Sequence, residues 1–361
     1  MVYFFGSLWY QRSVANVFSI HMVCSGRQAF FLFFQQVSVG EMSMLNISRL
    51  MVTVMLVLLL PVAVAWSGEG AFHRVRTLDV LDKDQFGREL AYPSTITFDP
   101  VENETYVTDA GKGQIVVYSP DYFPLAGFGG GRGLNAIYGV FVDGDRIYVC
   151  SGGNSEDARG RIVVFDQAFL PVKEIFFSDI PQVKNFIPRK VAVGKNGSLY
   201  VVGVNSSAVL VLAPDGRYLR SIAPQDQVLG VTEKASVISL AVGNDGRLYF
   251  LSEEMGRVYV FDREEHFLFK FGQKGGAEGK LSRPRGIAVD DKAGLAYVVD
   301  YMRHAVSVFD LTGKYLFEFG GKGVGRGWFT YPTDLCVDGR GHVLVTDTFN
   351  NRVQAFEVSA H

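Results

Sequence analysis

The sequence contains few of the residues that build disulfide frameworks and metal sites. It has three cysteines and six histidines in 361 residues. Small exported folds that depend on disulfides use many more cysteines, so that class is excluded. There is no Cys-x-x-Cys-His motif, and no two histidines have the spacing of a zinc site, so we expect no haem, no metal ion and no other cofactor. Cys150 and Cys336 are expected to be buried thiols that lie too far apart to form a disulfide.

An excess of charge of one sign is also missing. The formal net charge is −2, with 35 basic and 37 acidic residues. Proteins that bind nucleic acid neutralise phosphates with an excess of lysine and arginine, so we expect no nucleic-acid partner. Proline-rich stretches and runs of like charge are absent, whereas 48% of the residues are hydrophobic. This composition is typical of a folded chain and excludes extensive disorder.

The chain has no apolar run that is long enough for a membrane-spanning helix. The longest candidate, residues 50–60, is shorter than the ~20 residues that such a helix needs. Arg49 precedes it and the small residues Ala63-Val64-Ala65 follow it, which is the pattern of a cleaved secretory signal peptide. We therefore predict a signal peptide over residues 42–65, a secreted or periplasmic protein, and no stable membrane span after cleavage. Retention of the segment as an uncleaved anchor is the alternative.

The residues before this signal are unusual for an exported protein. Residues 1–41 are rich in aromatic side chains and contain a single acidic residue, Glu41. A signal peptide acts at the extreme N-terminus of a chain. Our hypothesis is that translation starts at Met42 or Met44, so that residues 1–41 are an untranslated or disordered extension.

What the sequence has in abundance is repetition. Six segments line up with one another. Each begins with a proline, isoleucine or valine and continues as a short alternating apolar run, and these opening residues recur every 44 to 51 positions. These opening residues, or anchors, are Pro93, Ile137, Pro188, Val237, Pro284 and Pro332. Alternation with a period of two is typical of a β-strand. A repeat of this length indicates a propeller or a solenoid.

Each repeat contains further strand-like runs after the first. The second runs read "TYVTD", "IYVCS", "LYVVG", "LYFLS", "AYVVD" and "VLVTD", and third and fourth runs follow in most repeats. Turn residues such as Asp143-Gly144 and Asn196-Gly197 separate the first run from the second. One four-stranded meander cannot cover both of its faces, but six stacked around an axis can. We predict an all-β, six-bladed β-propeller of four-stranded antiparallel blades, spanning residues 72–357 and monomeric.

The last repeat lacks its fourth strand, because the chain ends soon after "RVQAFE". An unassigned strand-like run, residues 74–81, stands before the first repeat. We predict that this N-terminal strand completes the last blade and so closes the ring.

The last two repeats resemble a known family. The segments "PRGIAVD…LAYVVDYMRHAVSVFD" and "PTDLCVD…HVLVTDTFNNRVQAFE" are similar to NHL repeats, whose pattern is Pro-x-Gly-hydrophobic-Ala-Val-Asp, then Val-x-Asp, then Asn-x-Arg-hydrophobic and Phe. Repeats two to four depart from it, because Ser151, Gly203 and Ser252 stand where Asp109, Asp300 and Asp347 end the second strand of the others. The resemblance implies a propeller. It leaves the function open, since propeller functions reside in the loops.

The glycine-rich stretch "FEFGGKGVGRGWFTYP", residues 317–332, could be mistaken for a phosphate-binding loop. It contains no Gly-Lys-Ser/Thr and does not fit Gly-x-Gly-x-x-Gly. It occupies the crossing from the outer strand of one repeat to the first strand of the next. An apolar residue recurs three positions before the anchor of four repeats: Leu90, Leu134, Leu281 and Phe329. We interpret the stretch as a turn, with this apolar residue as a plug beneath it.

Seven aspartates end strands and could suggest an acidic site. Four of them end a first strand (Asp99, Asp143, Asp290 and Asp338), and three end a second strand (Asp109, Asp300 and Asp347). Aspartate at such positions accepts hydrogen bonds from nearby backbone N–H groups. We therefore interpret all seven as structural residues that cap turns.

The candidate binding residues lie where the loops meet. In a propeller, the crossings and the loops that join strands two and three emerge on one face, around the mouth of the central tunnel. Tyrosine and arginine dominate binding hot spots. The candidates next to the anchors on this face are Tyr92, Tyr138, Arg189, Lys190, Arg283, Arg285, Tyr331 and Asp334. The polar loop over residues 152–160 is a further candidate contact.

Two functions are compatible with these observations. The first is an exported, non-enzymatic binding or scaffold propeller that recognises a protein, peptide or glycan through its loop-rich face. The alternative is an exported hydrolase or lyase with a site at the tunnel mouth, where Asp334 and either Arg189 or Arg285 would be the polar groups. The first is preferred because no set of residues forms a recognisable catalytic motif, and we assign no catalytic residue.

Overall fold

The computed structural model describes residues 16–23, 31–38, 73–153, 159–177, 180, 185–204, 206–228 and 230–360. The chain divides into two compact units, Met1–Ala71 and Phe72–His361. In the first unit, β1 (Asn16–Val23) and β2 (Phe31–Ser38) form an antiparallel hairpin. The predicted signal peptide lies outside the described residues. No helix in the described part of the chain is long and apolar enough to cross a membrane.

The second unit is built from six four-stranded antiparallel sheets, or blades. Blades one to three comprise β4 (Pro93–Asp99), β5 (Glu104–Asp109), β6 (Gln114–Tyr118) and β7 (Pro124–Gly129); β8 (Ile137–Asp143), β9 (Arg146–Ser151), β10 (Arg161–Phe165) and β11 (Pro171–Phe176); and β12 (Pro188–Val193), β13 (Leu199–Gly203), β14 (Val209–Leu212) and β15 (Tyr218–Ile222). Blades four to six comprise β18 (Ser239–Val242), β19 (Leu248–Ser252), β20 (Arg257–Phe261) and β21 (Phe267–Phe271); β22 (Pro284–Asp290), β23 (Leu295–Asp300), β24 (Ala305–Asp310) and β25 (Tyr315–Gly320); and β26 (Leu335–Val337), β27 (Val343–Asp347), β28 (Arg352–Ala360) and β3 (His73–Leu81).

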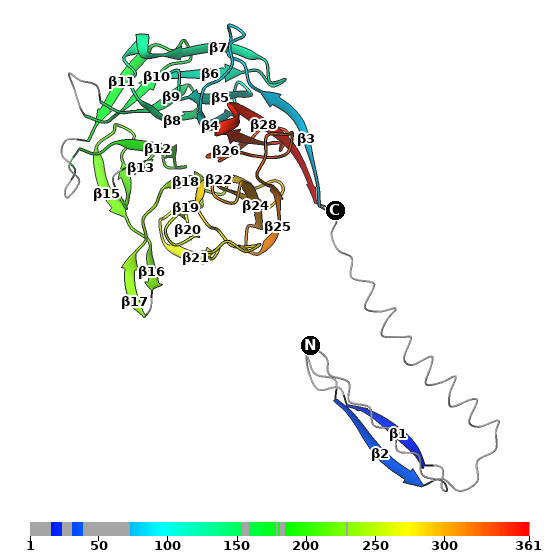
Figure 1. Ribbon diagram of the computed structural model, residues 1–361. Helices are drawn as coiled ribbons and strands as arrows, with labels where there is room; N and C mark the ends of the chain where they lie inside the picture. The colour runs from blue at the N-terminus through cyan, green and yellow to red at the C-terminus, as the bar shows by residue number, and fades with distance from the viewer. Residues whose placement is uncertain are drawn as a thin grey trace. The chain divides into compact units, whose positions relative to one another are not determined.

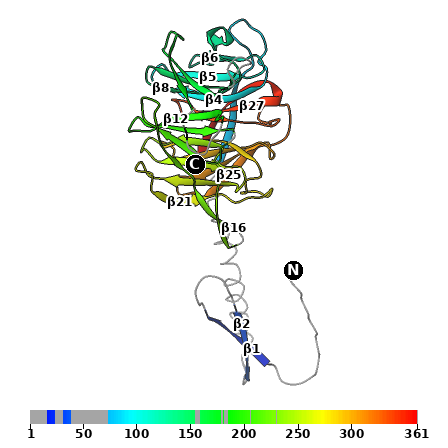
Figure 2. The same ribbon diagram turned by 90° about the vertical axis from the view of Figure 1, so that its left-hand side faces the viewer.

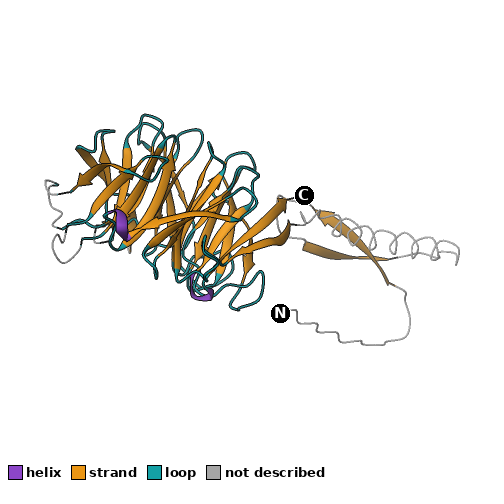
Figure 3. Ribbon diagram, turned by 90° about the horizontal axis from the view of Figure 1, so that it is seen from above, coloured by secondary structure: helices purple, strands orange, loops and turns teal. Residues whose placement is uncertain are grey.

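The first strands of the blades surround a central axis, as Figure 1 shows. Each first strand contacts the first strand of the next blade, and β26 contacts β4, so the contacts close a ring. Among the described residues strands account for nearly all of the regular structure, as Figure 3 shows, and the helices there are two short 3-10 helices, η1 (Gly130–Arg132) and η2 (Thr348–Asn350). The predicted six-bladed, all-β propeller is confirmed.

The ring is closed by the N-terminal strand of the propeller. Strand β3 pairs antiparallel with β28, from Leu81 opposite Val353 to His73 opposite Ala360. The register shifts once, between Ala355 and Phe356. The prediction that the run before the first repeat completes the last blade is therefore confirmed. Backbone hydrogen bonds, and no disulfide, join the two ends of this unit.

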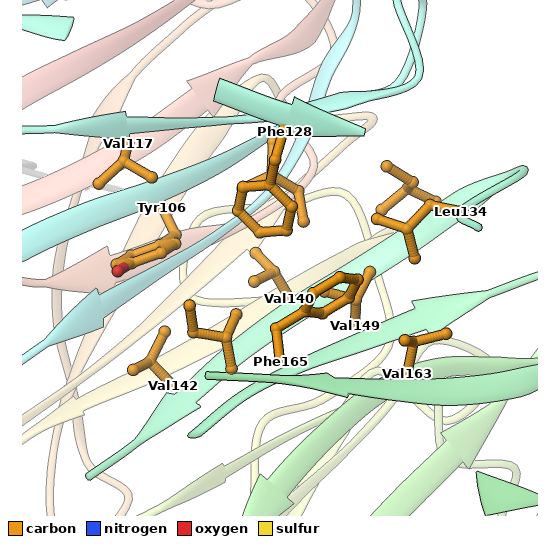
Figure 4. Close-up of a cluster of buried hydrophobic side chains, with 12 residues drawn as sticks. Tyr106, Val117, Phe128, Leu134, Val140, Val142, Val149, Val163 and Phe165 are labelled. Carbon is orange, nitrogen blue, oxygen red and sulfur yellow. The ribbon is translucent and has the colours of Figure 1, made fainter. Parts of the chain in front are cut away.

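The hydrophobic core is a series of layers between neighbouring blades. Figure 4 shows one of them, between blades one and two. Its labelled side chains are Tyr106, Val117, Phe128, Leu134, Val140, Val142, Val149, Val163 and Phe165. Each is at most 5% exposed. Burial of each large apolar side chain contributes about 1.5–3 kcal/mol, so the layers hold the blades together. Cys150 and Cys336 are buried free thiols, and burial raises the pKa of both.

The crossings between blades cover the apolar residues that the sequence predicts beneath them. Leu90, Leu134, Leu281 and Phe329 are all buried beneath their crossings. The glycine-rich stretch contains an isolated bridge between Lys322 and Phe329, and the preceding crossing contains the same bridge between Lys274 and Leu281. Gly320 has φ 102°, and a Cβ there would lie 2.6 Å from the Phe329 ring, so this position requires glycine.

The aspartates that end strands act mostly as caps. Three of the four that end a first strand accept hydrogen bonds from nearby backbone N–H groups: Asp99, Asp290 and Asp338. The carboxylate of Asp300, at the end of β23, accepts from its own turn, through Met302 N–H, and also from the preceding crossing, through Ser282 N–H. Asp300 therefore connects two loops on the same face of the propeller.

A hairpin that follows blade three was not predicted. Strands β16 (Gln225–Val228) and β17 (Val231–Lys234) form a hairpin between blades three and four that projects from the ring in Figures 1 and 2. Asp226 joins the hairpin to blade four, because its carboxylate accepts hydrogen bonds from Arg257, Tyr259 and Lys270, each at 2.6 Å. Burial opposes ionisation, but these hydrogen bonds hold the pKa of Asp226 well below its usual range.

Candidate ligand-binding site at the tunnel mouth

The tunnel mouth is formed by the first residues of the six inner strands. The anchors are buried, and the second residue after each anchor forms a ring of small or polar side chains. The members of this ring are Thr95, Gly139, Lys190, Ser239, Gly286 and Asp334. Below the mouth, a cavity of about 620 Å³ is lined by the inner strands of all six blades. The mouth therefore brings together side chains that are far apart in the sequence.

An ion pair crosses the tunnel at this level. Lys190 belongs to blade three and Asp334 to blade six, which are opposite blades of the ring. The Lys190 Nζ lies 2.6 Å from Asp334 Oδ1. The Lys190 side chain is 15% exposed and that of Asp334 is 3% exposed, so water screens the pair little. Both residues were predicted as site candidates, and the structure joins them directly.

The Asp334 carboxylate is held from three sides. Its Oδ2 accepts a hydrogen bond from the backbone N–H of Ile96 in blade one, at 3.2 Å. On the other side it packs over Gly286 of blade five, where a Cβ would lie 2.5 Å from Oδ1. Together with Lys190, these contacts occupy both carboxylate oxygens. Asp334 thus links blade six to blades one and three.

A second carboxylate, Glu253, stands at the rim of the mouth. It follows β19 and forms ion pairs with Arg283, at 2.7 Å, and Arg285, at 3.2 Å. Glu253 was not among the predicted candidates, which lie beside the anchors or in one of the loops between strands two and three. The rule that these loops share a face with the crossings could have identified it.

Arg189 has no such partner. Within the part of the chain that the structure describes, its guanidinium makes no hydrogen bond or ion pair, and the residue is half-buried. Burial and the nearby charge of Arg285 lower the pKa of Arg189, while Asp334 and Glu253 partly oppose this. Nearby, the Nε of Arg285 is also buried without a hydrogen-bond partner in the same part of the chain. Two guanidinium groups at the mouth therefore have unused donors.

An aromatic row adjoins these arginines. Its members are Tyr301, Tyr331, Phe349 and Tyr92, from blades five, six and one. Successive ring centroids lie 4.7, 5.1 and 5.4 Å apart. The guanidinium of Arg285 lies 5.4 Å from the Tyr301 ring, and that of Arg283 lies 5.8 Å from it, so the row begins at the mouth. Tyr92 and Phe349 are about half exposed.

Backbone contacts fix the row in place. Tyr331 has φ 52° and Tyr92 has φ 59°, a strained conformation for a bulky residue. The Tyr331 N–H donates to His304 Nδ1 at 3.0 Å, and the Tyr92 N–H donates to the Asn351 side chain at 3.1 Å. Hydrogen bonds to neighbouring side chains thus hold two tyrosines in an unfavourable conformation. Strain of this kind is common at binding sites.

The eight predicted candidates fall into three groups. Arg189, Lys190, Arg283, Arg285 and Asp334 gather at the mouth, and Tyr92 and Tyr331 lie in the aromatic row. Tyr138 is separate, because its ring packs over Gly152 and against the core between blades two and three. The loop over residues 152–160 lies partly outside the described residues. In the described part of the chain, no three His, Cys, Asp or Glu side chains are arranged to hold a metal ion.

Comparison with known families agrees with this architecture. The sequence pattern of the NHL repeat matches residues 281–309 and 329–356, which cover most of blades five and six. The chain is thus a six-bladed β-propeller in which two blades match the NHL repeat. These are the two repeats in which the sequence resemblance is closest. No curated protein sequence matches the chain.

Solved structures share the fold of this propeller at low sequence identity. An auxiliary nutrient binding protein from Bacteroides thetaiotaomicron is 14% identical with a TM-score of 0.56, over 80% of this chain and 77% of the other. Virginiamycin B lyase from Staphylococcus aureus is 13% identical with a TM-score of 0.53, over 79% and 99%. A putative gluconolactonase is 16% identical with a TM-score of 0.55, over 81% and 95%. At these identities the likeness concerns the fold alone.

Proposed function

We propose that this protein is an exported, non-enzymatic binding propeller, which recognises a protein, peptide or glycan through its loop-rich face. The observation that carries the proposal is the continuous surface formed by the tunnel-mouth arginines and the aromatic row. Arginine and tyrosine are the side chains that contribute most to binding hot spots. The row is partly exposed, and hydrogen bonds to neighbouring side chains fix Tyr92 and Tyr331, so little conformational entropy is lost when a ligand covers it.

The state of the acidic groups supports binding over catalysis. A hydrolase or lyase needs an acid or base that can exchange a proton with its substrate. At the tunnel mouth both oxygens of Asp334 accept hydrogen bonds from the protein, and Glu253 is paired with two arginines. The structural neighbours include a binding protein as well as enzymes, so the fold leaves both classes open. The proposal therefore rests on the side chains of this chain.

A pull-down with matched variants tests the proposal. The full chain is immobilised and exposed to the exported fraction of its own organism, and retained proteins, peptides and glycans are identified by mass spectrometry. The variants are Tyr92→Ala with Phe349→Ala on the loop-rich face, and Phe123→Ala as the control. Phe123 is 69% exposed but lies in the turn between β6 and β7, on the opposite face.

We expect the wild type and Phe123→Ala to retain the same ligand. The double variant should lose it by at least tenfold, because aromatic truncation at a hot spot costs about 2 kcal/mol or more. Retention that is equal in all three proteins would contradict the proposal. Turnover of a small molecule by the wild type, lost on substitution of Asp334, would favour the hydrolase or lyase instead.

A further inference from the structure

The tunnel mouth carries more positive charge than it can neutralise. Four cationic side chains gather there: Arg189, Lys190, Arg283 and Arg285. Two carboxylates oppose them, Asp334 and Glu253. This local excess occurs on a chain whose formal net charge is −2, so it is not a consequence of overall composition. An uneven distribution of this kind concentrates anions at the site.

The excess resides in Arg189. Lys190 is paired with Asp334, and Arg283 and Arg285 are both paired with Glu253. Arg189 is left without a hydrogen bond or ion pair in the described part of the chain. A guanidinium cannot relieve its burial by losing a proton, because its pKa stays far above neutrality. An unpaired guanidinium that is partly withdrawn from water has donors that a bound anion can fill with charge-assisted hydrogen bonds.

We propose that the tunnel mouth binds a carboxylate group of the ligand, held by the guanidinium groups of Arg189 and Arg285. The inference rests on the proposed binding function and names the chemistry that the site takes. Arginine presents its N–H donors in a planar fork that matches the two oxygens of a carboxylate. The unused Nε of Arg285 adds a donor beside the free guanidinium of Arg189. The aromatic row begins at the Tyr301 ring, within 5.4 Å of the Arg285 guanidinium, and packs against the remainder of the ligand.

Matched pairs of small molecules test the charge requirement on the full-length protein. The first pair is D-glucuronate and D-glucose, which represent an acidic and a neutral sugar. The second pair is N-acetyl-L-phenylalanine and its amide, which represent a peptide with and without its terminal carboxylate. Isothermal titration calorimetry measures each affinity at low and at high salt. The pair that shows the preference identifies whether the carboxylate comes from a sugar or from a peptide.

We expect the charged member of at least one pair to bind ten- to a hundredfold more tightly than its neutral partner. This range corresponds to the loss of a hydrogen bond to a charged group. The preference should weaken as salt is raised. Equal binding within both pairs, or no measurable binding of any of the four compounds, overturns the inference.

Substitution of Arg189 gives the second readout. Arg189→Gln should abolish the preference for the charged member, and Arg189→Lys should retain part of it. Arg263→Gln is the control, because Arg263 is 70% exposed and lies in the turn between β20 and β21 on the opposite face. The melting temperature of Arg189→Gln should equal or exceed that of the wild type, since the substitution removes a positive charge that has no ion-pair partner and lies near the charge of Arg285. A structural role would instead lower it.

The outcomes separate this inference from the proposed function. If the pull-down shows a ligand that depends on the aromatic row, but the compounds show no charge preference, the binding function stands and the carboxylate site is wrong. If Arg189→Gln lowers the melting temperature and leaves the preference unchanged, Arg189 is structural and the inference is also wrong.

Discussion

The two halves of the propeller ring differ in the residue that ends the second strand of each blade. In blades one, five and six the second strand ends in aspartate, whereas in blades two, three and four it ends in Ser151, Gly203 and Ser252. The serines make few contacts: Ser151 Oγ accepts from Asn135 N–H at 3.3 Å, and Ser252 Oγ accepts from Met255 N–H at 3.3 Å. At Gly203 the Phe186 ring fills the space that a side chain would take.

The difference separates the half of the ring whose loops are held by buried carboxylates from the half that lacks them. The aspartate half fixes its crossings with buried carboxylates, and it holds the aromatic row. The other half has no carboxylate at these positions and contributes Arg189, Lys190 and Glu253 to the tunnel mouth. Arg189 is unpaired in a half whose second strands end without an acidic residue. The aspartates that end second strands are thus confined to one half of the ring, whereas both halves contribute charged residues to the tunnel mouth.

The largest expected effect comes from breaking a cap in the aspartate half. Asp347 is fully buried and accepts hydrogen bonds from Thr330 N–H at 2.7 Å and from Arg352 Nε at 2.7 Å. Asp347→Ala should lower the free energy of unfolding by about 3–5 kcal/mol, because it leaves a buried arginine and a backbone donor unpaired. Ser252→Ala should cost about 1 kcal/mol or less. Urea denaturation measures both, and equal losses would contradict the comparison.

A smaller effect is expected where the two halves meet across the tunnel. In Gly286→Ala the new Cβ would lie 2.5 Å from Asp334 Oδ1, so the carboxylate must move away from Lys190. We expect a loss of about 1–3 kcal/mol, which is typical of overpacking. Gly131→Ala is the control, because its Cβ would meet nothing within 4 Å. If thermal melting shows the same stability for both variants, Asp334 is not held as tightly as described.

The smallest effect concerns pH and the buried His304 beneath the aromatic row. Burial, and secondarily the charge of Lys322, lowers the pKa of His304 below its ordinary value of 6.5. The unfolded chain therefore takes up this proton at a higher pH than the folded protein. The stabilisation is present above about pH 6.5 and is lost as pH falls further. Between pH 7 and 5 the free energy of unfolding should fall less steeply in His304→Gln than in the wild type.

The fold could be predicted because the sequence pattern of one blade recurs six times. Six anchors and their alternating runs give the same answer six times, and the missing fourth strand of the last repeat indicates how the ring closes. The hairpin of β16 and β17 could not be predicted in this way. It occurs once, its strands are short and polar, and its position depends on the contacts of Asp226 with blade four.

The site was predictable in location but not in pairing. The topology places the residues after the anchors at one mouth, which identified five of the residues that gather there. The Lys190–Asp334 pair joins residues 144 positions apart across a closed ring, and no local pattern indicates such a partner. Glu253, Tyr301 and Phe349 lie in loops between strands two and three, where the sequence analysis selected only the polar stretch over residues 152–160. Tyr138 has the right position in its strand, but its ring turns into the core.

The closure of the ring has a consequence for how the chain folds. Strand β3 is synthesised before all the other strands of the propeller, yet its partner β28 is synthesised last, with His73 opposite Ala360. Each of the first five blades can form from neighbouring segments as they become available. The sixth must wait for the whole chain, and its pairing has the largest loss of loop entropy to overcome. We therefore expect ring closure to be the last and slowest event, and a chain that lacks β28 to keep two unpaired edges that invite aggregation.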